Sequence, residues 1–315
     1  MNERIISLSE INPKEFFGPQ DATIKQLKAY FPKLKIVARG TEIKAFGEPI
    51  ILDEFEKRLE MLINYFDKYN KIDENSIEQF LMNTGNQKTT YPVAEGILVH
   101  GVGGKLVKAQ TENQRKMVSE MEINDMLFAI GPAGTGKTYT AVALAVKALK
   151  DKEVKRIILT RPAVESGENL GFLPGDLKDK LDPYMQPLYD ALRDMIPHEK
   201  LESHLEKGVI QIAPLAFMRG RTLDNAFVIL DEAQNTTAGQ MKMFLTRMGK
   251  RAKFIITGDP GQVDLPRKQV SGLKTSLLAL KGVKGIANVY LDEKDVIRHR
   301  LVKEIIKAYK TIETE

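Results

Sequence analysis

The sequence predicts an α/β protein whose parallel sheet is covered by helices on both faces, preceded by a small α+β domain. The first observation is a series of short, continuously apolar runs separated by amphipathic segments, which is typical of strands buried on both faces. The second is a glycine-rich stretch at 131–138 between one such run and a helical pattern. The third is an acidic pair, Asp231 and Glu232, that directly follows another apolar run.

The composition agrees with this class. The chain has 315 residues, of which 43% are hydrophobic and 28% charged, and its length suggests two domains. It has no cysteine, which excludes disulfides and thiolate metal sites and agrees with a cytoplasmic location. The amino terminus lacks a signal-peptide pattern, and no apolar run approaches a membrane span. We therefore expect a cytoplasmic protein without a membrane segment. Its net charge of +5 permits a nucleic-acid partner without requiring one.

The first domain is expected at 1–85. Asn12-Pro13 and Gly18-Pro19 suggest that about the first 20 residues are an extended lead-in. After it, the pattern predicts a helix, two strands, a long helix and a short helix, at 21–30, 35–38, 42–46, 52–68 and 75–82.

Positive charge is concentrated in this domain. Between residues 24 and 44, Glu42 stands alone against six cations, which are Lys25, Lys28, Lys33, Lys35, Arg39 and Lys44. One positive face on a small α+β domain would suit contact with a nucleic-acid backbone. A solvated, lysine-rich surface explains the same residues equally well, and the sequence leaves both interpretations open.

A polar stretch at 83–95 suggests a linker, and residues 97–108 suggest a β-hairpin. We assign 86–107 to this connection and 108–315 to the second domain. Gly101 to Gly104 formally match the GXXG clamp of KH domains. We reject that match because the glycines lie between two strand-like runs rather than between helices.

The second domain is expected to contain six strands and a final helix at 295–310. The strands are predicted at 126–130, 156–160, 209–213, 227–230, 254–257 and 286–291. The stretch 162–207 contains five prolines and is too long for an ordinary crossover between strands, so we expect an insertion over the functional site.

The glycine-rich stretch, Gly131-Pro-Ala-Gly-Thr-Gly-Lys-Thr138, matches the phosphate-binding loop (P-loop) motif G-x-x-x-x-G-K-[ST]. Its backbone N–H groups can surround an anion at the start of a helix. Lys137 is expected to reach the β- and γ-phosphates of a nucleotide, and the Thr138 hydroxyl to bind Mg²⁺. These features predict a P-loop NTPase with a RecA-like sheet. The expected nucleotide-binding residues are Gly131, Pro132, Ala133, Gly134, Thr135, Gly136, Lys137, Thr138 and Tyr139.

Two further motifs indicate hydrolysis. Asp231 ends an apolar strand, where its carboxylate can hold Mg²⁺ through water, and Glu232 can polarise the attacking water. The turn Gly258-Asp-Pro-Gly-Gln262 ends another strand, and Gln262 is placed to sense the γ-phosphate. The alternatives are two acids that cap the next helix and a turn that merely ends a strand.

The three motifs together resemble motifs I, II and III of superfamily 1 helicases, and the chain is more closely similar to the bacterial PhoH-like family. The resemblance covers about 108–311. It rests additionally on Arg161-Pro-Ala-Val-Glu-Ser-Gly-Glu-Asn-Leu-Gly-Phe-Leu-Pro-Gly-Asp176, Asp182-Pro-Tyr184, Phe244-Leu-Thr-Arg-Met-Gly249, Val263-Asp-Leu-Pro266 and Asp295-Val-Ile-Arg-His299. The first domain is similar to the KH-like, RNA-binding half-domain of longer family members, although it has no usable GXXG loop.

The resemblance implies an ATPase that uses ATP and Mg²⁺, forms a homo-oligomeric ring, commonly a hexamer, and acts on single-stranded RNA. It implies that Gln114 contacts the adenine edge and that the segment Arg161 to Asp176 faces the nucleic acid. Superfamily 1 helicases take a catalytic arginine from a second core domain, which this sequence lacks. We therefore expect a neighbouring subunit to supply it, with Arg298 as the candidate and Arg247 or Arg267 as others. An intrachain ion pair of Arg298 with Asp292, Glu293 or Asp295 is the alternative.

Three functions remain open at the level of the sequence. The first is an RNA-stimulated ATPase or helicase, the second a P-loop kinase, and the third a slow, nucleotide-gated scaffold that controls a partner protein. Glu232 and the turn at Gln262 favour hydrolysis over phosphoryl transfer to an acceptor. The four histidines show no metal-binding spacing.

Overall fold

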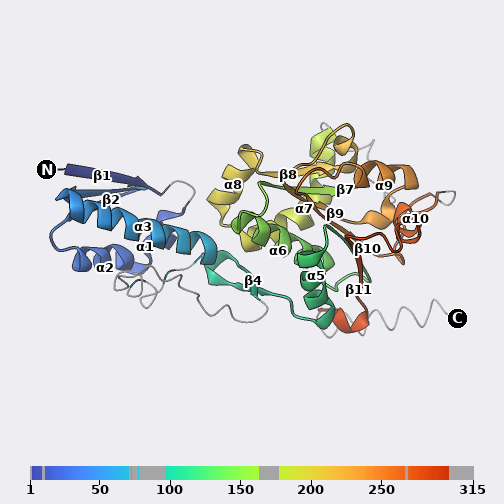
Figure 1. Ribbon diagram of the computed structural model, residues 1–315, viewed down its shortest axis with the longest axis horizontal. Helices are drawn as coiled ribbons and strands as arrows, with labels where there is room; N and C mark the ends of the chain where they lie inside the picture. The colour runs from blue at the N-terminus through green and yellow to red at the C-terminus, as the bar shows by residue number, and fades with distance from the viewer. Residues whose placement is uncertain are drawn as a thin grey trace. The chain divides into compact units, whose positions relative to one another are not determined.

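The computed structural model of the chain describes residues 2–8, 11–70, 72, 77, 97–162, 177–266 and 269–297. The chain divides into two compact units (Figure 1). The first unit comprises Met1–Lys108 together with Asp190–Ile210, and the second comprises Ala109–Tyr189 together with Gln211–Glu315.

The first unit is built on a three-stranded antiparallel sheet in the order β1-β3-β2. Its strands are β1 (Asn2–Ser7), β2 (Lys35–Arg39) and β3 (Glu42–Gly47). The helices α1 (Pro13–Phe17), α2 (Ala22–Tyr30) and α3 (Pro49–Tyr69) pack against one face of the sheet. Phe16, Leu27, Ile43, Phe55 and Leu59 are fully buried between them, which explains the helical period of the apolar residues.

The expectation of an extended lead-in over the first 20 residues is wrong, because β1 and α1 occupy it. β1 pairs antiparallel with β3, from Asn2 opposite Gly47 to Ser7 opposite Glu42. α1 begins at Asn12, whose side chain accepts a hydrogen bond from the N–H of Lys14, and has Pro13 at its first position. Proline is favoured there because the first N–H of a helix has no partner inside the helix. Asn12-Pro13 is therefore a helix start rather than a break.

The hairpin also belongs to the first unit. It consists of β4 (Ile97–His100), a 3₁₀ turn at Val102–Gly104 and β5 (Leu106–Lys108). Its glycines lie between two strands, as expected, so the rejection of a GXXG clamp is supported. Helix α8 (His198–Glu206) and the end of α7 (Leu177–Met195) pack in the same unit. There Asp67 forms an ion pair with Lys200, and Lys105 forms one with Asp194 at 2.7 Å.

The second unit contains a six-stranded sheet in the order β11-β6-β10-β9-β7-β8. The strands are β6 (Met126–Ile130), β7 (Arg156–Arg161), β8 (Ile210–Pro214), β9 (Ala226–Leu230), β10 (Lys253–Gly258) and β11 (Ile286–Tyr290). The pairings of β11 with β6, β6 with β10, β10 with β9 and β9 with β7 are all parallel. The parallel sheet is confirmed, and the carboxyl ends of its strands meet along one edge.

Helices cover both faces of this sheet, as predicted (Figure 1). On one face lie α5 (Glu112–Ile123) and α6 (Lys137–Lys150). On the other lie α9 (Ala238–Leu245), α10 (Gly272–Ala279) and a 3₁₀ turn at Leu215–Met218. Successive side chains of a strand point to opposite faces of the sheet, so the residues of each strand pack alternately against one layer of helices and the other. Phe128, Val228 and Phe254 pack with Met241 and Phe244 on the α9 side.

Several predictions concern residues outside the described part of the chain. These are the helix at 75–82, apart from Ile77, most of the linker, residues 163–176 and the final helix beyond Ile297. Before that point the structure has a 3₁₀ turn at Glu293–Asp295. Within the described residues, no helix is long and apolar enough to cross a membrane.

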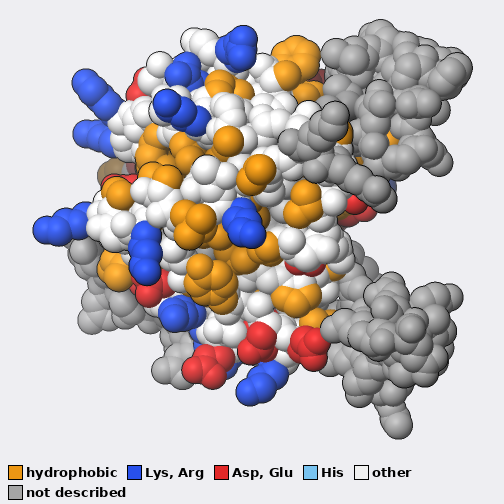
Figure 2. All heavy atoms as spheres, turned by 90° about the vertical axis from the view of Figure 1, so that its right-hand side faces the viewer, with side chains coloured by type: hydrophobic (Ala, Val, Ile, Leu, Met, Phe, Trp, Pro, Cys, Tyr) orange, Lys and Arg blue, Asp and Glu red, His pale blue; other side chains and the backbone are white. Residues whose placement is uncertain are grey.

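One face of the second unit carries exposed apolar side chains. Figure 2 shows hydrophobic side chains gathered on the side where Figure 1 places α10 and β11. The large apolar residues exposed on these two elements and their flanking turns are Val270, Leu278, Val283 and Tyr290. Exposed apolar patches often mark protein contacts.

Candidate nucleotide site

The P-loop connects the end of β6 to the start of α6, as predicted. Gly131 N–H donates to the Gly258 carbonyl at 3.1 Å, which fastens the loop to β10. A Cβ on Gly131 would lie 2.4 Å from the Leu291 carbonyl oxygen, and one on Gly136 would lie 2.6 Å from Nε2 of Gln114. Gly136 also has a left-handed φ of 77°. Both positions therefore require glycine, and the loop presents backbone to the amino terminus of a 14-residue helix, where anions bind.

Lys137 is buried in this loop. Its Nζ donates to the carbonyl oxygens of Gly131 at 2.6 Å and Pro132 at 2.8 Å. The ammonium thus lies inside the loop whose backbone is predicted to surround a phosphate, and its contact with the β- and γ-phosphates stays a prediction. Thr135 closes the turn by donating its hydroxyl to the Pro132 carbonyl at 2.9 Å.

Asp231 is the centre of the site. It follows β9, is 2% exposed, and its Oδ1 accepts hydrogen bonds from the hydroxyls of Thr138 and Thr257, both at 2.6 Å. These oxygens fit Mg²⁺, which prefers oxygen ligands and usually takes one or two protein groups besides phosphates and water. The described residues contain no cluster of three or more metal-binding side chains, so they offer no competing all-protein cage.

Two residues of this site, Thr257 and Arg161, were not predicted as part of the nucleotide site. Arg161 was expected only as the first residue of the segment that faces the nucleic acid. Arg161 ends β7, Asp231 follows β9, and Thr257 lies near the end of β10. Because side chains alternate along strands, all three point to the face covered by α6, where Thr138 lies. The sequence did offer a signal, because each of these three apolar strands ends with, or is directly followed by, a polar residue whose side chain points to the α6 face.

Arg161 connects three parts of the site. Its Nε lies 2.9 Å from Oδ2 of Asp231, an ion-pair contact whose angle does not make it a hydrogen bond. Its Nη2 donates to Oε1 of Glu232 at 3.0 Å, and its Nη1 donates to the carbonyl of Tyr184 in α7 at 2.5 Å. The guanidinium therefore neutralises both acids of the pair.

Glu232 has a left-handed backbone, with φ of 53°. That conformation is costly for a residue with a side chain and is common at functional sites. Its Oε2 accepts a hydrogen bond from Nε2 of Gln234 at 2.6 Å, and Oε1 of Gln234 accepts one from the N–H of Asp259 at 3.0 Å. The acid is thereby linked to the turn that carries Gln262.

Gln262 is exposed on a loop that is held at both ends. Its N–H donates to the Asp259 carbonyl at 3.0 Å. Farther along, Asn235 pairs twice with Asp264, through the N–H of Asp264 at 2.8 Å and through its carboxylate at 3.2 Å. The structure thus places the loop beside the acidic pair, and the role of Gln262 as a γ-phosphate sensor stays a prediction.

Gln114 lies beneath the P-loop and is 2% exposed. Its Oε1 accepts from the N–H of Gln110 at 2.8 Å, and its Nε2 donates to the Thr135 carbonyl at 2.9 Å. These bonds tie α5 to the P-loop. An adenine contact through this amide, which stays a prediction, would have to replace one of them. Tyr139 is half-buried on the first turn of α6.

The last described residues also meet the site. Ile297 N–H donates to the Gly134 carbonyl at 3.0 Å. Asp295 is buried and its Oδ2 accepts from Nδ2 of Asn113 at 2.8 Å. Burial alone would raise the pKa of Asp295, but hydrogen bonds from Thr111 and Asn113 favour the charged form and hold the pKa below its ordinary value. Arg298 itself lies outside the described residues.

Of the other arginine candidates, Arg267 also lies outside the described residues, whereas Arg247 is occupied within its own chain. The guanidinium of Arg247 donates to the carbonyls of Met243 and Arg221 and to the hydroxyl of Thr246, at 3.1 to 3.3 Å. To act in the nucleotide site of a neighbouring subunit, Arg247 would have to lose these three hydrogen bonds.

The cations of the first unit do not form one face. α2 packs on the side of the sheet that carries Ile43 and Ala45, and its Lys25 and Lys28 are exposed. Lys44, which lies between Ile43 and Ala45 in β3, points to the opposite face and forms an ion pair with Glu42 at 3.3 Å. The six cations therefore do not all share one face, because Lys25 and Lys28 lie on α2 and Lys44 lies on the other side of the sheet. Contact of this unit with nucleic acid stays a prediction.

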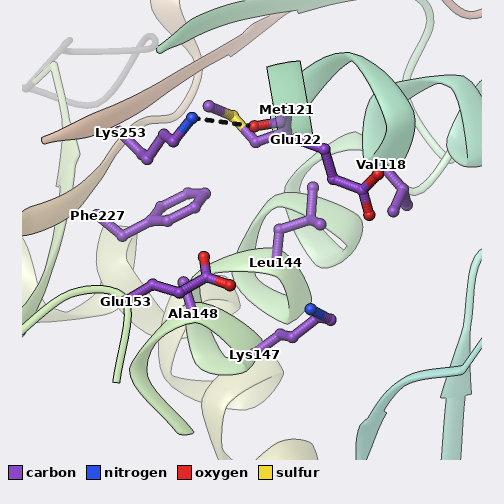
Figure 3. A pocket seen from close by; sticks show the side chains of 9 residues that line it. All are labelled: Val118, Met121, Glu122, Leu144, Lys147, Ala148, Glu153, Phe227 and Lys253. Atoms are coloured by element: carbon purple, nitrogen blue, oxygen red, sulfur yellow. Dashed lines mark hydrogen bonds between the residues drawn. The ribbon is translucent and has the colours of Figure 1, made fainter. Parts of the chain in front are cut away.

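A separate hollow of about 270 Å³ lies at the amino ends of the strands, where β9 and β10 begin (Figure 3). Side chains of α5, α6, β9 and β10 line it, including Val118, Leu144 and Phe227. Lys253 points toward it but donates to the carbonyls of Asn124 at 2.6 Å and Met121 at 3.3 Å. Its ammonium thus holds the end of α5, and the hollow is not part of the P-loop site.

A strand, a glycine loop at a helix amino terminus and a buried carboxylate bonded to the loop threonine define a P-loop nucleotide-binding protein. The family model described as PhoH-like protein matches residues 106–310. A PhoH-like protein of Bacillus subtilis is 47% identical over 98% of this chain and 99% of its own length, and one of Synechocystis is 46% identical over 90% and 88%. Protein PhoH of Escherichia coli is 44% identical over 64% of this chain and 58% of its own length. The chain belongs to the PhoH-like protein family.

Proposed function

We propose that the protein is a Mg²⁺-dependent ATPase that acts on single-stranded RNA and works as a homo-oligomeric ring, most simply a hexamer. The observation that carries the proposal is the position of Asp231 and Glu232 beside the P-loop. Asp231 shares its Oδ1 with the hydroxyls of Thr138 and Thr257, and Glu232 is the adjacent acid. A binding site alone would need the first acid, whereas hydrolysis needs a second one to polarise water.

The residues of this chain would divide the work as follows. The loop amides and Lys137 bind the phosphates, and Thr138 and Asp231 hold the cation. When bound, Mg²⁺ neutralises charge on the β- and γ-phosphate oxygens. Glu232 accepts a proton from the attacking water, and Gln262 orients that water from the loop fastened by Asn235.

The RNA and ring parts of the proposal rest on other observations. The segment 161–176 begins at Arg161, whose guanidinium contacts both Asp231 and Glu232, so a nucleic acid bound at Arg161 would adjoin the acidic pair. The exposed apolar residues on α10 and β11 favour contact between copies. In a ring, Arg298 of one subunit could complete the site of its neighbour, and such an arginine contributes roughly 10³ to 10⁵ in rate.

The test is steady-state phosphate release over a range of protein concentrations, with and without single-stranded RNA. We expect a rate per chain that rises with concentration, because sites complete themselves between subunits, and a further increase with RNA. Glu232→Gln should keep ATP binding and lose at least about 10²-fold in rate. Tight ATP binding with negligible turnover would instead favour a nucleotide-gated scaffold, and a phosphorylated acceptor would favour a kinase.

A further inference from the structure

Both oxygens of the expected catalytic base are occupied by the protein itself. Oε1 of Glu232 accepts from Arg161 at 3.0 Å, and Oε2 accepts from Gln234 at 2.6 Å. A general base must take the proton of water through one of these oxygens. The side chain of Glu232 is 42% exposed, so it has room to leave the pair, whereas that of Arg161 is only 15% exposed.

The same arginine competes with a metal ion. Oδ1 of Asp231 serves the two threonine hydroxyls, and Oδ2 lies 2.9 Å from Nε of Arg161. A divalent cation arriving at this carboxylate would meet a fixed positive charge within a few ångströms, and like charges at that separation repel strongly in a partly buried site. Arg161 thus opposes full occupation of the site while it remains in place.

The third contact of Arg161 connects it to α7. Nη1 donates to the Tyr184 carbonyl, in a turn between Pro183 and Pro187. Pro187 has no N–H, so the helix lacks its regular hydrogen bond to the Pro183 carbonyl, and this turn is held less firmly than an ordinary one. Arg161 is also the last residue of β7 and the first residue of the segment 161–176, which is proposed to meet RNA.

We propose that Arg161 is a positioning residue that couples RNA to hydrolysis by holding Glu232 and Asp231 in a paired, slow arrangement until an RNA phosphate draws its guanidinium away. A phosphate suits this exchange because it accepts two parallel hydrogen bonds from a guanidinium, as a carboxylate does. Release frees Oε1 of Glu232 for water and Oδ2 of Asp231 for the cation. This inference rests on the proposed RNA-stimulated ATPase.

The test compares Arg161→Gln with Arg156→Gln in the full-length chain. Arg156 is the matched control, because it begins the same strand and donates to the Asp224 carbonyl at 3.0 Å, at the opposite edge of the sheet. We expect Arg161→Gln to raise the RNA-free rate about tenfold and to reduce RNA stimulation to near one, as the loss of one charged hydrogen bond would do. Arg156→Gln should keep the wild-type ratio. An Arg161→Gln protein with a lower RNA-free rate, or with stimulation intact, would overturn the proposal.

Arg161→Lys gives a second variant that keeps the charge and can pair with only one acid, so its RNA-free rate should lie between those of wild type and Arg161→Gln. A rate at or below that of wild type contradicts the pairing.

A binding measurement separates this inference from the proposed function. The affinity for ADP is measured by calorimetry at increasing Mg²⁺ concentrations. In Arg161→Gln, the half-maximal effect of Mg²⁺ on this affinity should occur at an about tenfold lower Mg²⁺ concentration, because the competing charge is gone. ADP binding without Mg²⁺ should be unchanged. A wild-type Mg²⁺ dependence in Arg161→Gln would overturn the role of Arg161 even in a protein that hydrolyses ATP. Conversely, an absence of turnover in wild type would defeat the proposed function and with it the coupling to hydrolysis, whereas the competition between Arg161 and the cation would still be decided by the Mg²⁺ titration.

Discussion

At the scale of single residues, the site depends on what surrounds one buried carboxylate. Asp231 is almost inaccessible to water, so its charge is stabilised by Thr138, Thr257 and Arg161 rather than by solvent. Thr138 was evident from the P-loop motif. Thr257 and Arg161 were not assigned to this site, because their contacts with Asp231 depend on which strands are neighbours, and no single segment of the sequence determines the strand order.

Thr257→Val tests the contribution of one of the groups that stabilise the charge of Asp231. The change keeps the shape of the side chain but removes the hydroxyl that donates to Oδ1 of Asp231 at 2.6 Å. We expect kcat/KM for Mg²⁺-ATP to fall about tenfold, since a hydrogen bond to a charged group contributes on the order of 1.5 to 3 kcal/mol. The control is Thr23→Val, because Thr23 is equally buried but donates to the Phe16 carbonyl in the first unit. Equal effects of the two variants on kcat/KM would contradict the assignment.

The burial of Lys150 predicts how the free energy of unfolding depends on pH. Burial lowers its pKa from 10.5 to about 8, and Asp151 opposes the shift only in part. The folded pKa is below the unfolded one, so the unfolded chain binds more protons between these values, and the stability contributed by this group is lost as pH falls toward 8. Below about pH 8, Lys150 is protonated in the folded and the unfolded state, and the folded state is destabilised by the full free energy of keeping an ammonium half-buried.

Lys150→Met should therefore raise the free energy of unfolding at pH 7 by about 1 kcal/mol, after allowance for partial solvent access. The gain should shrink from about pH 8 upward and vanish above about pH 10.5. Urea unfolding at several pH values measures it. Lys147→Met serves for comparison, since Lys147 lies on the same helix, its side chain is 39% exposed, and it pairs with Asp151 at 3.1 Å. A gain from Lys150→Met that does not depend on pH would rule out this explanation.

At the scale of elements, the sequence was most informative where one segment determines its own structure. The strands of the second unit were predictable because a run of five consecutive apolar residues, as in Met126–Ile130, is long enough for a strand buried on both faces but short for a helix. β1 was missed because its pairing with β3 is a nonlocal contact and because Asn12-Pro13 was interpreted as a break. The division of the cations between two surfaces was missed for the same reason, since it follows from packing.

The loop that carries Gln262 offers a test at this scale. Asn235 is its main attachment, with two hydrogen bonds to Asp264. Asn235→Ala should loosen the loop without touching the phosphate-binding residues, so kcat should fall about tenfold while KM for ATP stays near its wild-type value. Asn235→Asp should also lower kcat, because it places two carboxylates together.

Asn124→Ala is the control for that variant. Asn124 donates only to Glu120 in its own helix end, far along the chain from the loop. It should leave kcat unchanged. A large rise in KM for Asn235→Ala, with kcat intact, would show that the loop affects ATP binding rather than the positioning of water.

At the scale of the whole molecule, the question is whether one chain completes its own site. The P-loop, the acidic pair and the fastened loop all come from the second unit. The hydrogen bond from Ile297 to Gly134 brings the chain back to its own P-loop immediately before Arg298. The proposed arginine could therefore act in the same chain or in a neighbour, and the two arrangements give different results in mixed oligomers.

Mixing two defective variants distinguishes them. Glu232→Gln and Arg298→Ala are each expected to be nearly inactive. If Arg298 acts on a neighbour, random mixed rings contain intact sites wherever a Glu232-bearing chain meets an Arg298-bearing one, so an equal mixture should recover about a quarter of the wild-type rate. If it acts within its own chain, no mixed site is intact and no rate returns. Glu232→Gln mixed with Lys137→Ala is the control and should stay inactive, because both residues belong to the same chain's half of the site. Recovery in that control would mean that the P-loop and the acidic pair of one chain do not form a single site.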